Sequence, residues 1–100
     1  MRIRILPSAL ADLARGRRFY ERQGEWLGDY FMNSLYSDID SLALYGGIHL
    51  KVGNYHRLLS KRFPYAIYYR INDEVVDVWR VLDCRQDPQK TRRALENPGL

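Results

Sequence analysis

The chain has few of the residues that build metal sites or disulfides. Of its 100 residues, one is cysteine (Cys84) and two are histidines (His49 and His56). A single cysteine excludes an internal disulfide, and the spacing of these three residues matches no metal-ligand pattern. We therefore expect no metal and no cofactor. We expect Cys84 to be a small, partly buried residue at a strand end rather than a nucleophile, because no histidine stands in an evident activating arrangement with it.

Long apolar runs and common catalytic motifs are also missing. No stretch approaches the roughly 20 apolar residues that span a bilayer, and residues 1–5 lack the apolar segment of a signal peptide. We therefore expect a cytoplasmic protein. The chain contains no Gly-rich phosphate loop, no nucleophile elbow and no carboxylate pair placed for glycoside hydrolysis. These absences argue against the most common phosphate-binding, esterase and glycosidase sites.

The composition is that of one globular domain, residues 1–100, with an uneven distribution of charge. Apolar residues make up 46% of the chain and charged residues 28%, which argues against disorder. The 16 Lys and Arg exceed the 12 Asp and Glu, for a formal charge of +4. Residues 1–50 hold 6 basic and 6 acidic groups, whereas residues 51–100 hold 10 basic and 6 acidic groups. This excess suits a polyanion or an acidic protein partner, although a basic surface kept for solubility has the same composition.

The first half predicts a strand followed by two helices. Residues 2–6 alternate polar and apolar side chains, as a half-buried strand does, and Pro7 ends this pattern. We expect Ser8 to be the N-cap of a first helix that ends near Gly24. Its apolar face carries Ala9, Leu13, Gly16 and Tyr20. After a connection through residues 25–28, a second helix is indicated by the spacing of Phe31, Leu35, Ile39 and Leu42.

The second half predicts three strands and a short helix. The strands are residues 55–61, 65–71 and 75–82, with turns between them. The last strand is apolar on both faces, so we place it in the middle of the sheet without assigning its inward face. Asp87 and Pro88 have the form of an N-cap and a first helical residue, which predicts a helix over residues 89–95 before a break at residues 97–99. The order is β-α-α-β-β-β(-α), an α+β fold in which the helix hairpin must be covered by the sheet.

Basic and aromatic side chains dominate the strands and the segment after them. They are His56, Arg57, Lys61, Arg62, Tyr68, Arg70, Arg80 and Arg85. Arg and Lys among tyrosines suit single-stranded RNA, and a metal-independent ribonuclease uses such groups to stabilise the phosphorane and to transfer protons. The same composition is typical of the solvated face of a half-covered sheet. It also suits a surface that receives an acidic or apolar peptide. Composition leaves these interpretations open.

Several segments together resemble one known family. They are residues 5–9, 12–13, 19–21, 28–31, 57–59, 62–69 and 85–88. These segments, spread over nearly the whole chain, resemble the ParE/RelE toxin superfamily of type II toxin-antitoxin systems, also called plasmid stabilisation proteins. Residues 62–69 are the most specific, and they are closer to the ParE branch. The resemblance implies two antiparallel helices packed on a curved, mainly antiparallel sheet, in agreement with the order of elements above.

The resemblance also implies a function. Members similar to ParE are toxins that poison DNA gyrase and are held inactive by a cognate antitoxin, whereas members similar to RelE cleave messenger RNA in the ribosome. In the RNA-cleaving branch an arginine usually stands where this chain has Ala66, and a catalytic Tyr or His follows the last strand. Residues 85–93 contain neither, and only Arg85 matches a basic position there. Without these groups RNA cleavage would lose several kcal/mol of transition-state stabilisation, which favours a protein-binding toxin over an enzyme.

The expected site residues follow from the basic and aromatic set. Under the favoured hypothesis, the residues that bind the antitoxin or gyrase are Arg57, Lys61, Arg62, Tyr68, Arg70, Arg80 and Arg85. One alternative is a RelE-like, ribosome-dependent endoribonuclease that uses Arg57, Lys61, Arg62 and Arg85. Only this alternative involves RNA or the ribosome. A second alternative is a non-toxic family member that still binds an antitoxin. No membrane partner is expected under any of the three.

Overall fold

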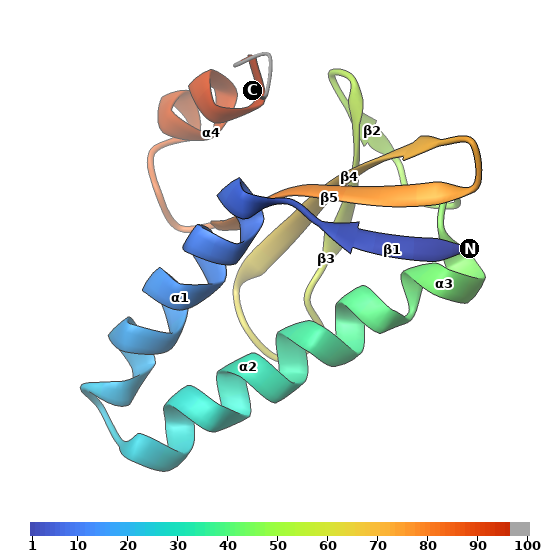
Figure 1. The fold of residues 1–100 in the computed structure, drawn as a ribbon. Coiled ribbons are helices and arrows are strands. Elements are labelled where there is room, and N and C mark those ends of the chain that lie inside the picture. Colours follow the sequence, from blue (N-terminus) through green and yellow to red (C-terminus); the bar gives the residue numbers. More distant parts are fainter. Residues whose placement is uncertain (97–100) are drawn as a thin grey trace.

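A five-stranded mixed sheet with helices on both faces forms the part of the chain, residues 1–96, that the computed structural model describes (Figure 1). The strands, in their order across the sheet, are β1 (Arg2–Ile5), β5 (Val75–Asp83), β4 (Tyr65–Asn72), β3 (Tyr55–Leu59) and β2 (Lys51–Val52). The helices are α1 (Pro7–Glu21), α2 (Glu25–Asp40), α3 (Leu42–Tyr45) and α4 (Pro88–Glu96). Strand β1 is parallel to β5, and the other pairings are antiparallel. The predicted α+β fold and the internal position of the last strand are confirmed.

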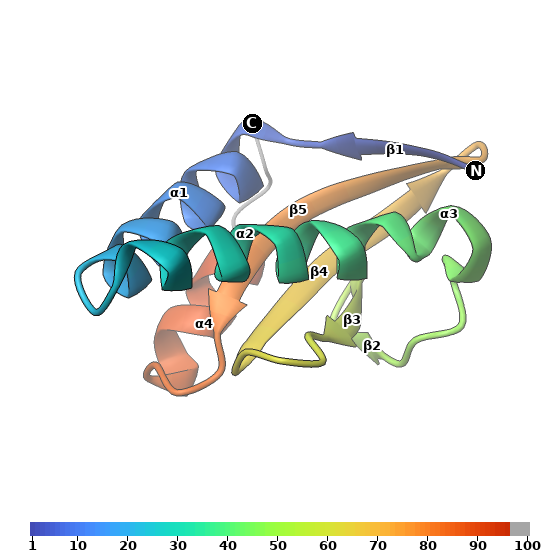
Figure 2. The same cartoon turned by 90° about the horizontal axis from the view of Figure 1, so that it is seen from below.

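Helices α1 and α2 form the predicted hairpin on one face of the sheet (Figure 2). All the residues predicted for their apolar faces are buried, and the core between hairpin and sheet includes Phe31, Leu35, Tyr65, Ile67 and Tyr69. A Cβ added at Gly16 would lie 2.5 Å from Cζ of Phe31. The two helices therefore approach each other closely because this position has no side chain.

Helix α4 covers part of the opposite face. A second buried cluster lies there, formed by Tyr55, Ala66, Tyr68, Trp79 and Leu82, and the half-buried Ala94 and Leu95 of α4 pack against it. The indole Nε1 of Trp79 donates to the carbonyl of Ala94 at 3.3 Å. Asp87 caps the helix as predicted, since its Oδ1 accepts from the backbone N–H of Gln89 at 2.9 Å. The predicted break at residues 97–99 lies outside the described residues.

A β-bulge in β5 explains why its inward face was not evident from the sequence. Tyr68 pairs with Arg80 and Tyr69 pairs with Val78, so Trp79 is an extra residue on β5. The bulge reverses the alternation of side chains. Val76, Val78 and Val81 therefore all pack in the core under α1 and α2, although they do not share a single period of two. Trp79 and Leu82 belong to the opposite face.

Three local predictions were wrong. Helix α1 begins at Pro7, a favoured first helical residue, so that Leu6 is at the N-cap position, and the Ser8 hydroxyl donates to the carbonyl of Trp79 at 2.6 Å. Ser8 is therefore a link to β5 rather than an N-cap. Helix α2 begins at Glu25, so the segment predicted as a connection is its first turn. Cys84 is exposed, because it lies in the turn that follows β5 rather than in the strand.

Candidate partner-binding face

Arg57, Tyr68 and Cys84 lie together on the sheet face opposite the helix hairpin. Arg57 on β3 and Tyr68 on β4 are cross-strand partners, and the Nε of Arg57 donates to the Tyr68 hydroxyl at 3.2 Å. Its Nη2 lies 3.8 Å from the Sγ of Cys84, in the turn after β5. These residues line a hollow of about 200 Å³ that is closed on one side by Pro88 and Thr91 of α4. Within residues 1–96 the guanidinium of Arg57 has no carboxylate partner.

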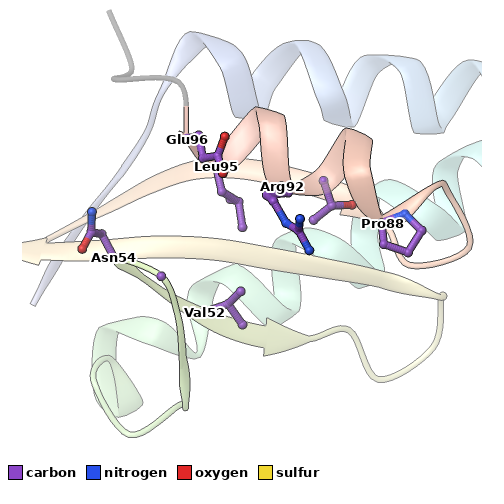
Figure 3. Close-up of a pocket in the computed structure, with 8 residues that line it drawn as sticks. Val52, Asn54, Pro88, Arg92, Leu95 and Glu96 are labelled. Atoms are coloured by element: carbon purple, nitrogen blue, oxygen red, sulfur yellow. The ribbon is translucent and has the colours of Figure 1, made fainter.

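A larger hollow of about 640 Å³ lies between α4 and the turn that joins β2 to β3 (Figure 3). Its lining residues include Val52, Asn54, Arg92, Leu95 and Glu96. Pro88 and Thr91 line this hollow as well as the one beside Arg57. The two hollows therefore adjoin each other along α4, and together we call them the α4 trench.

Arg80 is a structural link between β5 and α1. Its Nε and Nη2 donate to the two carboxylate oxygens of Asp12 at 2.7 and 3.0 Å. The same carboxylate accepts from Arg15 and from the backbone N–H of Val81, the latter at 2.9 Å. The side chain of Asp12 is 2% exposed and that of Arg80 is 21% exposed. The charge of Arg80 is thus largely neutralised within the fold.

Arg85 is likewise held by residues of this chain. Its Nε and Nη2 donate to the carboxylate of Asp83 at 2.9 and 2.8 Å, and Nη2 lies 3.4 Å from the Tyr20 hydroxyl. These hydrogen bonds hold the pKa of Asp83 below its usual value. The guanidinium also lies 5.9 Å from the ring centre of Phe19, within the range of a cation–π contact. Because Tyr20 and Phe19 belong to α1, Arg85 faces the hairpin and makes none of the contacts of Arg57.

The remaining predicted residues lie at the margins of the sheet. Lys61 and Arg62 are exposed in the turn between β3 and β4. The backbone of this turn is held by Asp38, which accepts from the Ser60 hydroxyl at 2.7 Å and from the Lys61 N–H at 3.3 Å. Arg70, exposed on β4, places its guanidinium 5.2 Å from the ring centre of Tyr55. The structure therefore brings Arg57 and Tyr68 together in the trench and distributes the other five predicted residues elsewhere.

Both histidines contact Tyr69, whose ring lies in the core under the hairpin. The Tyr69 hydroxyl accepts from the Gly47 N–H at 2.9 Å and forms a hydrogen bond with Nδ1 of His49 at 2.5 Å. The His56 ring stacks on Tyr69 and its Nδ1 donates to the His49 carbonyl at 2.7 Å. Burial lowers the pKa of His49, and the nearby His56 lowers it further. These contacts hold the loop before β2 against the sheet, so both histidines have a structural role.

The arrangement is better suited to binding than to proton transfer. The described residues that line the trench include no histidine, and of its two carboxylates Asp83 is already bound to Arg85, while Glu96 lies in the other hollow. On the hairpin side of the sheet, burial raises the pKa of Tyr65 to about 12, even further above neutral pH than that of an ordinary phenol, so Tyr65 is not suited to act as a base. Within the described part of the chain, no group of three His, Cys, Asp or Glu side chains is placed to hold a metal ion. What the trench offers is cationic, apolar and hydrogen-bonding groups in two adjoining open hollows.

The sequence did not predict the part of the trench that is formed by α4, β2 and the turn after β2. Val52, Asn54, Arg92 and Leu95 were not among the predicted site residues, because β2 and α4 are about 40 residues apart in the chain and meet only in the fold. One indication was available in the sequence of α4. Its apolar Ala94 and Leu95 accompany three basic residues, which is typical of a helix that presents a cationic side next to an apolar one.

A helix hairpin on one face of a mixed sheet, with a short C-terminal helix on the other, defines a small α+β protein of the ParE/RelE-like class. The family model described as "ParE toxin of type II toxin-antitoxin system, parDE" matches residues 3–88. The chain belongs to the ParE toxin family. Helix α4 therefore lies almost entirely beyond the matched residues.

A solved structure has the same fold. The structure described as a chromosomal ParDE TA system from P. aeruginosa matches with a TM-score of 0.71 and 19% sequence identity. The match covers 81% of this chain and 92% of that chain. A search of curated protein sequences finds no significant match. Across residues 1–96, no helix is both long enough and apolar enough to span a membrane.

Proposed function

We propose that this protein is the toxin of a type II toxin-antitoxin pair, that it poisons DNA gyrase, and that a cognate antitoxin neutralises it. The observation that carries the proposal is the match of the ParE toxin family model over residues 3–88. The structure with which this chain shares its fold is described as a ParDE toxin-antitoxin system. A toxin of this kind acts by binding another protein, so it needs exposed contact residues rather than a catalytic centre.

The geometry supports protein binding over RNA cleavage. The four residues of the ribonuclease alternative do not share one site: Arg57 lies in the trench, Lys61 and Arg62 lie on a turn, and Arg85 is paired with Asp83 beside α1. A phosphorane needs its cationic groups and a proton-transfer group around one phosphorus atom. We therefore do not propose a ribonuclease.

We propose that the seven predicted residues contact partner proteins in different ways. Arg57, Lys61, Arg62 and Arg70 are the proposed primary contacts, whereas Tyr68, which is 4% exposed, is proposed to act mainly by holding Arg57 through its hydroxyl. Arg57, Lys61, Arg62 and Arg70 have no carboxylate partner within hydrogen-bonding distance in the described part of the chain. Arg85, with 54% of its side chain exposed, can contact a partner while it retains Asp83. Arg80 is proposed to act mainly by holding β5 against α1.

The proposal predicts a specific loss of gyrase function. Induced expression in a bacterial host without the antitoxin should arrest growth and trigger a DNA-damage response, and the purified protein should reduce supercoiling by gyrase and increase cleaved DNA. Coexpression of the antitoxin should restore growth, which is the matched control. Unchanged gyrase activity at saturating protein would refute the gyrase assignment. New codon-linked ends in the transcripts would favour the ribonuclease instead, and normal growth at high soluble expression would favour the non-toxic alternative.

A further inference from the structure

We propose that the α4 trench binds an extended segment of a partner protein that presents both acidic and apolar side chains on one face. Under the function proposed above this segment belongs to the antitoxin, and only the identity of the partner rests on that function. The site itself is inferred from the shape, lining and charge of the trench.

The shape suits an extended chain. The two hollows, of about 640 and 200 Å³, adjoin each other at Pro88 and Thr91, so they follow one another along α4. Leu95 and Arg92 project from α4 toward the strands, and Val52 approaches them from β2 (Figure 3). Val52 is 43% exposed. An apolar side chain placed between Val52 and Leu95 would remove surface of all three residues from water, which is favourable.

The charged residues that line the trench favour an acidic partner segment. Five arginines elsewhere form ion pairs, namely Arg4, Arg15, Arg17, Arg80 and Arg85. The two trench arginines, Arg57 and Arg92, have no such partner in residues 1–96. Of the carboxylates that line the trench, Asp83 is bound to Arg85 and Glu96 is the second. Helix α4 carries three basic residues against this one acid. A carboxylate from a partner would form charge-assisted hydrogen bonds with either guanidinium.

A peptide fits this surface better than a nucleic acid does. Single-stranded nucleic acids bind where exposed aromatic rings stack on bases beside a continuous cationic track. The rings on this face are covered, since Tyr55, Tyr68 and Trp79 are 5%, 4% and 7% exposed. Arg57 and Arg92 lie in different hollows, with Pro88 and Thr91 lining both. Each hollow therefore combines one arginine with apolar groups, which matches an extended peptide that presents both acidic and apolar side chains on the same face.

Most of the α4 wall lies outside the residues that the family model matches. The match ends at residue 88, whereas Thr91, Arg92, Leu95 and Glu96 all lie beyond it. Under this proposal, contacts with the α4 wall contribute to the choice of antitoxin. Specificity of this kind arises from contacts that only one of several similar partners can make.

Direct binding to the full-length protein tests the inference. The probe is a fluorescein-labelled synthetic peptide of Glu-Glu-Leu-Leu repeats, which places both Glu and Leu on each face of an extended chain. It is compared with the Lys-Lys-Leu-Leu counterpart, and binding is followed by fluorescence anisotropy. We expect the Glu peptide alone to bind, more weakly as salt is raised. Arg57→Glu and Arg92→Glu should each weaken binding by about tenfold or more. Arg18→Glu is the matched control, because Arg18 is exposed on α1 and does not line the trench, and it should leave binding within about twofold.

Three outcomes would overturn the inference. The first is that the Glu peptide does not bind. The second is that the Arg57→Glu and Arg92→Glu variants bind it as tightly as the wild-type protein does. The third is that a thymidine oligonucleotide competes for the site as well as unlabelled Glu peptide does. Circular dichroism identifies variants that fail to fold, and Arg57→Gln and Arg92→Gln then repeat the test without charge reversal. The proposed function fails separately, if the wild-type protein does not arrest growth. If the wild-type protein does arrest growth, and the antitoxin binds and neutralises the Arg57→Glu variant as well as it does the wild type, the toxin function stands and the trench inference fails.

Discussion

Arginine side chains in this protein have two different environments. Arg80 and Arg15 share the buried carboxylate of Asp12, which also accepts the Val81 N–H, whereas Arg57 and Arg92 line an open trench without an acidic partner in residues 1–96. A buried carboxylate without partners is strongly disfavoured, so Asp12 and its donors act as one unit. Arg80 and Asp12 are 68 residues apart in the chain. The sequence therefore does not distinguish Arg80 from the arginines without an acidic partner, and only the fold shows that its charge is compensated.

Replacing Asp12 should destabilise the protein substantially. Asp12→Asn removes the charge that compensates Arg80 and weakens several hydrogen bonds, and we expect the free energy of unfolding to fall by about 2 to 4 kcal/mol. Urea denaturation measures this change. Asp29→Asn is the control, since Asp29 is 66% exposed and pairs with Arg17 at the surface, where such a pair contributes at most about 1 kcal/mol. Equal effects of the two substitutions would contradict the structural role assigned to Asp12.

At the scale of elements, two glycines in the helix hairpin differ in what a side chain at their position would contact. A Cβ at Gly16 would lie 2.5 Å from Cζ of Phe31, a ring that is fully buried in the core. A Cβ at Gly28 would lie 2.3 Å from Cγ of Glu21, the middle of a flexible, exposed side chain. The first contact is between packed elements, whereas the second can be relieved by rotation of one side chain.

Alanine substitution should separate these two positions. Alanine favours a helix over glycine by about 1 kcal/mol, but at Gly16 the clash with Phe31 should outweigh this gain and lower stability by about 1 to 2 kcal/mol. Gly28→Ala should be neutral or slightly stabilising. Thermal denaturation of both variants measures the difference. A Gly16→Ala variant as stable as Gly28→Ala would show that the hairpin can separate without cost.

The bulge in β5 explains why the alternation of apolar side chains along this strand did not reveal its inward face. Alternation predicts the two faces of a strand only when every residue pairs in register. One extra residue at Trp79 shifts the later residues to the other face, so Val81 joins Val76 and Val78. The strand, its central position and its β-branched composition were all predictable, whereas its faces depended on the register adopted with β4.

At the scale of the whole molecule, the two faces of the sheet carry cores of unequal size. The core under α1 and α2 contains most of the buried apolar residues. Helix α4 has no buried residue of its own and packs through Ala94 and Leu95 onto the smaller cluster around Trp79. The stability of the fold should therefore depend mainly on the hairpin side, and α4 should contribute mainly to the binding surface.

Removing α4 tests this division. We expect a chain truncated after Asp87 to remain folded, with the midpoint of thermal unfolding lowered by several degrees because the Trp79 cluster loses its cover. Acrylamide quenching of Trp79 fluorescence should increase. Trp26 is 69% exposed, so both proteins carry Trp26→Phe, and the full-length variant is the control. Loss of all secondary structure, or unchanged quenching, would contradict the proposed division.

The sequence by itself determined the order of elements, the helix hairpin, the central strand, the cap at Asp87 and the family. These features depend on local periodicity, on the backbone preferences of proline and glycine, and on short segments of characteristic sequence, all of which are properties of neighbouring residues. Only the tertiary structure decided which arginines are compensated, which face of β5 is inward, and that β2 and α4 enclose a trench. Those features depend on contacts between residues far apart in the chain, and a local pattern carries no information about which distant partner will neutralise a charge or cover a surface.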